Sequence, residues 1–134
     1  MRVVLDTNIL VSAFVFPGGI RESVYRLALE GGIVSVTSPA LLAEFGRVLG
    51  QKFEWEASRV EEAVAQVASI GIVVRPIEAV REIVADPSDD RVLEAAAEGQ
   101  AEIIVSGDRH LRDLGTWRGI RVLRATQFVA EVEP

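Results

Sequence analysis

The sequence predicts an α/β fold built on a mostly parallel sheet. Short apolar, β-branched runs alternate with longer segments of helical periodicity along the 134 residues, a pattern typical of a parallel sheet covered by helices on both faces. Two of the apolar runs also end abruptly in polar residues, as strands do at the ligand-binding edge of such sheets. No repeat, low-complexity run or linker interrupts residues 1–134, so we expect a single-domain, three-layer sandwich.

The predicted strands are short runs of branched apolar residues, and the breaks around them are rich in glycine and proline. Buried parallel strands have this composition. We expect strands at residues 3–5, 33–36, 72–74, 103–105 and 120–123.

Helices are predicted where apolar residues recur every three or four positions. The apolar segment 9–16 ends at Pro17-Gly18-Gly19, and Ser38 with Pro39 is typical of a helix start. Gly71 and Gly99 are typical of helix ends. We expect helices at residues 22–30, 39–49, 56–70, 76–84, from about 88 to 98, and at 126–132.

Composition narrows the class of protein. Absence of cysteine excludes disulfides, thiolate zinc sites and a cysteine nucleophile. No run approaches the ~20 apolar residues of a membrane span, so we expect a soluble, cytoplasmic protein. The net charge of −6 argues against nucleic-acid binding, unless the acids gather in one metal-binding cleft.

The first candidate site follows the first strand. Val3–Leu5 leads directly into Asp6, Thr7 and Asn8, which places a carboxylate, a hydroxyl and an amide at the carboxyl edge of the sheet. Asp and Asn also cap helices, so these residues have a purely structural interpretation as well.

Two predicted helices carry further acids. Glu44 lies on the flank of an apolar stripe and points either to solvent or into a cleft. Asp89 and Asp90 lie in the first turn of a helix, where the macrodipole favours negative charge. That effect does not account for Glu94, which is four residues after Asp90 on the same face, where like charges repel.

The fourth strand repeats the pattern of the first. Ile103–Val105 is followed by Ser106 and Asp108, and right-handed crossovers can bring Asp6, Asp90 and Asp108 together, with Glu44 reaching the same cleft. Clustered carboxylates repel unless a cation neutralises them. Oxygen ligands without His or Cys favour Mg²⁺ or Mn²⁺, and such a site suits hydrolysis of a phosphodiester.

These motifs together resemble a PIN domain, and more narrowly the VapC-like toxins of prokaryotic toxin–antitoxin systems. The resemblance implies a PIN-like (Rossmann-like) fold and an Mg²⁺- or Mn²⁺-dependent ribonuclease. It also implies RNA as substrate and a cognate antitoxin as partner. By this resemblance Asp6, Glu44, Asp90 and Asp108 form the catalytic, metal-binding quartet, and Thr7, Asn8 and Ser106 support it. Asp89 and Glu94 are additional acids, and either could take the place of Asp90 in the quartet. We assign Asp90 because the apolar residues two and three positions after it fit the family spacing.

Other interpretations remain open. A catalytically silent PIN-like scaffold that binds RNA or protein is the main alternative to the nuclease, and phosphotransfer is disfavoured because Lys52 is the only lysine and lies in a helix–helix break. Affinity for RNA then has to come from local arginines such as Arg109, Arg112 and Arg118, or from a dimer surface. A homodimer is expected if Tyr25, Phe53 and Trp55 exceed what one core buries.

Overall fold

The sheet has six strands, and the ends of β1 and β4 lie side by side. In the computed structural model, which describes residues 1–83 and 86–133, the strand order is β3-β2-β1-β4-β6-β5, with every pair parallel except β5 with β6. The chain extends from β1 to β2 and β3 on one side and to β4 and β6 on the other, so the topological switch point lies between β1 and β4. The strands are β1 Arg2–Leu5, β2 Val34–Thr37, β3 Ile72–Val73, β4 Ile103–Val105, β5 Thr116–Trp117 and β6 Ile120–Leu123.

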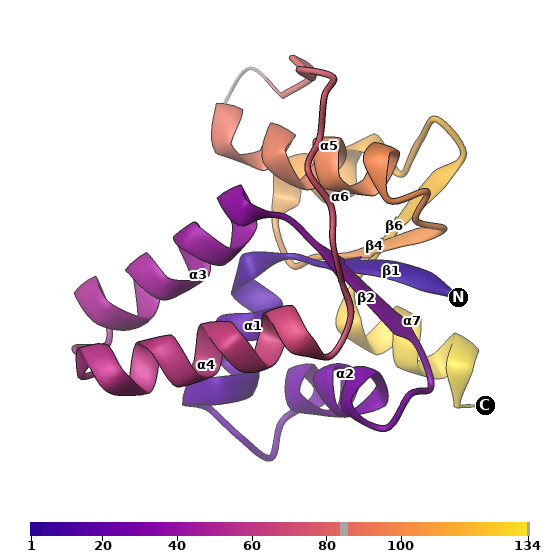
Figure 1. Ribbon diagram of the computed structural model, residues 1–134. Coiled ribbons are helices and arrows are strands. Elements are labelled where there is room, and N and C mark those ends of the chain that lie inside the picture. Colours follow the sequence, from indigo (N-terminus) through magenta and orange to yellow (C-terminus); the bar gives the residue numbers. More distant parts are fainter. Residues whose placement is uncertain (84–85, 134) are drawn as a thin grey trace.

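Helices cover both faces of this sheet, which confirms the predicted α/β fold class. In Figure 1, α5 and α6 lie on one side of the sheet, and α1, α2, α4 and α7 on the other. The helices are α1 Thr7–Val15, α2 Ile20–Leu29, α3 Pro39–Gln51, α4 Ala57–Ser69, α5 Asp90–Glu98, α6 Arg109–Leu114 and α7 Ala125–Val132, with a 3₁₀ turn at Pro87–Asp89.

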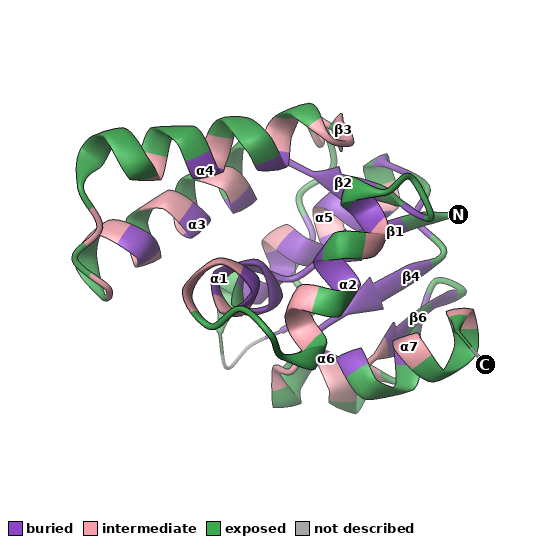
Figure 2. Cartoon of the chain, turned by 90° about the horizontal axis from the view of Figure 1, so that it is seen from below, coloured by how far each residue is buried: buried purple, intermediate pink, exposed green. Residues whose placement is uncertain are grey.

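The pleat of the central strands divides the apolar side chains between two cores. Val3 and Leu5 of β1 pack with α1, α3 and α7, whereas Val4 packs with α5 and α6 on the opposite face. Figure 2 shows the buried residues concentrated along β1, β4 and the inner helix faces. The central strands are thus fixed from both sides, and their carboxyl ends become rigid positions for side chains.

The segment between β3 and α5 forms no helix over residues 76–83, and the predicted helix over 76–84 is therefore wrong there; Val84 lies outside the described residues. We call residues 74–83 the strap. Its backbone N–H groups donate to acids of α5: Ile77 to Glu98 at 3.1 Å, Val80 to Glu94 at 2.9 Å, and Ile83 to Asp90 at 2.9 Å.

The strap therefore runs antiparallel to α5 and uses three carboxylates spaced four residues apart. Positions four apart lie on one face of a helix, which explains why like charges recur there. Their mutual repulsion is offset by hydrogen bonds from backbone groups that would otherwise lack partners. Val80 and Ile83 are buried against α5, so the strap also completes one core.

Two elements after Asp108 were not predicted. Residues 109–114 form α6, and β5 pairs with β6 in a hairpin whose two turn residues, Arg118 and Gly119, have φ of 51° and 79°. Positive φ at both positions is characteristic of a type I′ turn. Elsewhere the predicted helices and strands are present with small shifts of their ends.

The aromatic residues considered for a dimer surface pack within one chain. Tyr25 is buried, Phe53 and Trp55 are half-buried, and Phe14 contacts both Tyr25 and Trp55 with ring centroids 5.1 and 6.5 Å apart. Each of these aromatic residues thus packs against apolar side chains of its own chain. No helix among residues 1–83 and 86–133 is long and apolar enough to cross a bilayer.

The strap generates a stability prediction. We expect Glu94→Ala to lower the free energy of unfolding by about 1–3 kcal/mol, because the buried Val80 N–H loses its acceptor. Urea denaturation measures this, and amide exchange at Val80 should accelerate. Glu61→Ala, at an exposed position of α4, is the matched control; equal effects of the two substitutions would contradict the role of the strap.

Candidate active site

A short hydrogen bond joins the ends of β1 and β4. The Ser106 hydroxyl donates to Asp6 Oδ2 at 2.6 Å, and the Asp6 backbone N–H donates to the Val105 carbonyl at 3.0 Å. Asp6 and Ser106 are both buried, with 5% and 0% of their surface exposed. Asp6 stands at the N-cap position of α1, yet its side chain makes no capping hydrogen bond. The side chain is directed across the switch point, and a purely capping role does not explain it.

Asp108 is held beside this pair through the same hydroxyl. Its backbone N–H donates to Ser106 Oγ at 2.9 Å, while its Oδ1 caps α6 by accepting from the Leu111 N–H at 3.1 Å. Ser106 therefore donates to one acid and accepts from the backbone of the other. Asp6 and Asp108 converge as predicted, on the carboxyl edge of neighbouring strands.

Glu44 approaches from α3. The Thr7 hydroxyl donates to Glu44 Oε2 at 3.4 Å, and the Glu44 charge acts on Asp6. Thr7 is buried and Glu44 half-buried. Of the two orientations that the helix pattern left open, the structure favours the one in which Glu44 faces the cleft.

The fourth acid is Asp89. Its carboxyl is buried and interacts with Asp108 and, more weakly, with Asp6, and its Oδ2 atom has no hydrogen-bond partner among the described residues. Asp90 is directed elsewhere, since its Oδ1 accepts the backbone N–H groups of Glu82 and Ile83 at 3.1 and 2.9 Å. The geometry thus favours Asp89 in the place predicted for Asp90.

Electrostatics reflect this crowding. Burial raises the pKa of Asp6 to about 6; the hydrogen bond from Ser106 opposes the rise, and the charges of Glu44 and Asp108 add to it. Burial, followed by the charge of Asp108, also raises the pKa of Asp89 well above its usual range. Keeping these carboxylates together thus lowers the stability of the folded chain. Acid clusters with shifted pKa values are common at functional sites.

A hard divalent cation fits the chemistry of this group, because carboxylate oxygens are its preferred ligands and the buried Asp89 oxygen lacks a partner in the part of the chain that the structure describes. As the side chains stand, no three acidic or histidine residues in the described ranges are spaced to ligate one ion. Binding therefore requires the carboxylates to draw together.

The other predicted residues lie at the margin of the group or away from it. Asn8 is exposed in the first turn of α1, and Arg109 is exposed and 3.7 Å from Asp113 on its own helix. Glu94 binds the strap and Arg91 rather than the other acids. Arg112 lines a cavity beside Gly107 together with Arg21 and Arg124, and no sequence pattern indicated the last two residues.

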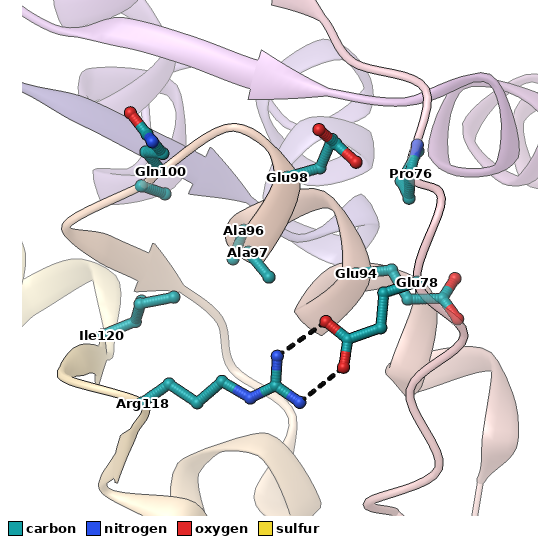
Figure 3. A pocket seen from close by; sticks show the side chains of 10 residues that line it. Pro76, Glu78, Glu94, Ala96, Ala97, Glu98, Gln100, Arg118 and Ile120 are labelled. Carbon is teal, nitrogen blue, oxygen red and sulfur yellow. Dashed lines mark hydrogen bonds and ion pairs between the residues drawn. The ribbon is translucent and has the colours of Figure 1, made fainter.

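A second cavity, of about 490 Å³, lies at the opposite edge of the sheet, beside the starts of β4 and β6 (Figure 3). Its charged groups already have partners. Arg118 makes two hydrogen bonds to Glu78, at 2.8 and 2.7 Å, and Glu94 and Glu98 accept from the strap. Arg118 is thus remote from the acid group of Asp6, Glu44, Asp89 and Asp108, and this cavity is not the candidate active site.

Comparison with known proteins identifies the family of the chain. Residues 2–110 match the PIN domain family. The chain is also 30% identical over 118 residues to the uncharacterized protein MJ1680 of Methanocaldococcus jannaschii, a match that covers 85% of this chain and 75% of that protein. PIN domains are generally nucleases that use divalent metals. The matched residues include β1, α3, α5, β4 and all four acids of the group, and we conclude that this chain belongs to the PIN domain family.

Proposed function

We propose that this protein is a divalent-metal-dependent endoribonuclease. The observation that carries the proposal is the buried Asp89 oxygen, which has no hydrogen-bond partner among residues 1–83 and 86–133 and lies beside Asp108 and Asp6 at the switch point of the sheet. An isolated, unpaired carboxylate in such a position is costly, and a cation would remove the cost. Resemblance to VapC-like PIN proteins supports RNA as the substrate.

The residues of this chain have distinct tasks in the proposed site. Asp6, Asp89 and Asp108 would hold Mg²⁺ or Mn²⁺, which supplies charge stabilisation at the phosphate and a more acidic water. Ser106 fixes the Asp6 carboxylate and the backbone of Asp108. Glu44, positioned by Thr7, orients the attacking water or completes the metal shell.

The reaction is a hydrolysis. The water oxygen forms a bond to phosphorus, the bond from phosphorus to one ribose oxygen breaks, and that oxygen takes up a proton. One RNA fragment therefore ends in a phosphate and the other in a hydroxyl. Half-burial of Glu44 leaves its carboxylate accessible to the proton of the attacking water.

Cleavage of a pooled RNA substrate with Mg²⁺, Mn²⁺ or EDTA tests the nuclease and the acid assignment together. We expect metal-dependent cleavage that Asp89→Asn lowers by about 100-fold or more. Asp90→Asn is the matched variant, and it should retain most activity because Asp90 serves the strap. If Asp90→Asn abolished cleavage and Asp89→Asn did not, the assignment would be reversed. If no metal supported cleavage or bound to the protein, the silent scaffold would be favoured.

Stability measurements provide a test that needs no substrate. Without metal, Asp89→Asn should raise the free energy of unfolding by about 1–2 kcal/mol, because it removes a carboxyl whose ionisation is disfavoured by burial and by the charge of Asp108. Added Mn²⁺ should raise the thermal midpoint of the parent protein but not that of Asp89→Asn. An equal midpoint shift in both proteins would show that the metal binds elsewhere.

The same resemblance extends the proposal to a toxin role. A type II toxin with this activity would be held inactive by a cognate antitoxin. A homodimer of it would use a contact surface outside Tyr25, Phe53 and Trp55. We expect expression in a bacterial host to arrest growth and Asp89→Asn to relieve the arrest. Growth curves with matched protein levels measure this, and arrest that persists in the variant would argue against a nuclease toxin.

A further inference from the structure

A cavity lined by three arginines opens beside the acid group. It has a volume of about 320 Å³ and lies where α2, α6 and α7 meet the loop after β4. Arg21, Arg112 and Arg124 line it together with Gly107 and Thr126, and no acidic residue contributes to its lining. We call this cavity the arginine cleft. In a chain with a net charge of −6, such a concentration of positive charge is a local exception.

The arginine cleft borders the proposed site at Gly107. Gly107 lies between Ser106 and Asp108, and the Arg21 guanidinium packs so closely on it that a Cβ at position 107 would collide with Arg21 Nη2. Arg21 is held there by hydrogen bonds from Nη1 to Ser12 Oγ at 3.0 Å and to the Asn8 carbonyl at 3.5 Å. An RNA strand bound at Asp108 would therefore lie next to Arg21.

The charges in the arginine cleft are not neutralised by the described part of the chain. The ion pairs in the described part of the chain are made by arginines outside the cleft, namely Arg26, Arg91, Arg109, Arg118 and Arg121. The Nε atom of Arg112 is buried without a hydrogen-bond partner there. The first turns of α2 and α7 line the same cavity, and helix N-termini carry partial positive charge.

From this geometry we infer that the arginine cleft binds the phosphodiester backbone of the RNA strand adjacent to the cleavage point. Guanidinium groups match phosphate oxygens in two-point contacts, and backbone N–H groups at helix N-termini favour the same ligand. Contacts to phosphate fix the register of a strand without reading its bases. The inference rests on the proposed function for its ligand, because the acids would define where the strand is cut.

Binding in EDTA separates this inference from cleavage. We expect the parent protein to bind a fluorescent 20-nucleotide single-stranded RNA, measured by anisotropy over a series of salt concentrations. Arg112→Gln and Arg124→Gln should each weaken binding several-fold and reduce the slope of log K against log salt by about 0.7. Arg59→Gln, an exposed arginine of α4, removes the same charge and should leave the slope unchanged.

The outcomes are distinguishable. Equal effects of the cleft variants and Arg59→Gln, or no RNA binding by the parent protein, would overturn the inference even if the protein cleaves RNA with metal. Loss of binding only in the cleft variants would support it even if no cleavage were found. Displacement of the RNA by millimolar inorganic phosphate would point to free phosphate as the ligand and overturn the strand assignment. Unchanged urea unfolding midpoints exclude misfolding as the cause.

In the active protein, the cleft variants should raise KM for RNA and leave kcat close to that of the parent, since the arginines contact the strand away from the reacting phosphate. A fall in kcat with unchanged KM would instead place these arginines in the chemical step. The kinetic constants of the cleft variants are compared with those of Asp89→Asn, which alters the acid group and is expected to lower cleavage.

Discussion

The buried hydrogen bond from Ser106 to Asp6 is the interaction on which the rest of the site depends. Two parallel strands meet at the switch point, and one hydroxyl satisfies a carboxylate of the first and a backbone N–H of the loop after the second. Burial strengthens such a bond and makes its loss costly. Asp6 can therefore stay next to Asp108 despite repulsion, and the position of Asp108 in turn sets the environment of Asp89.

Helix α5 and the turn before it separate two kinds of acid. Adjacent residues near a helix start differ by about 100° in direction, so Asp89 faces the acid group while Asp90 faces the strap. Asp90, Glu94 and Glu98 accept backbone hydrogen bonds, whereas one oxygen of Asp89 accepts none from the described residues. Acidic side chains thus stabilise the fold on one side of the helix and lower its stability on the other, a distribution expected at functional sites.

Much of the fold could be predicted because the apolar runs 3–5 and 103–105 indicate two strands, each followed directly by polar residues. Neighbouring parallel strands place those polar ends side by side at one edge of the sheet. The choice between Asp89 and Asp90 could not be predicted, because it depends on the path of residues 76–83. The sequence of this segment suggested a helix, but in the folded chain its extended backbone donates hydrogen bonds to the carboxylates of α5. Arg21 and Arg124 escaped notice because they come from helices distant in sequence and meet at Gly107 only in the folded chain.

An acidic chain can bind a polyanion if its charges are segregated, and the structure indicates how. Acids at the switch point would be neutralised by a bound cation, whereas several other acids are paired with arginines or with the strap. The arginines that line the cleft form no ion pair with the acids of the described residues. Salt screens interactions beyond about 8–10 Å, so a phosphate within the cleft responds to the nearest guanidinium groups more than to the net charge. Under the proposed function, local placement and not overall composition would decide affinity for RNA.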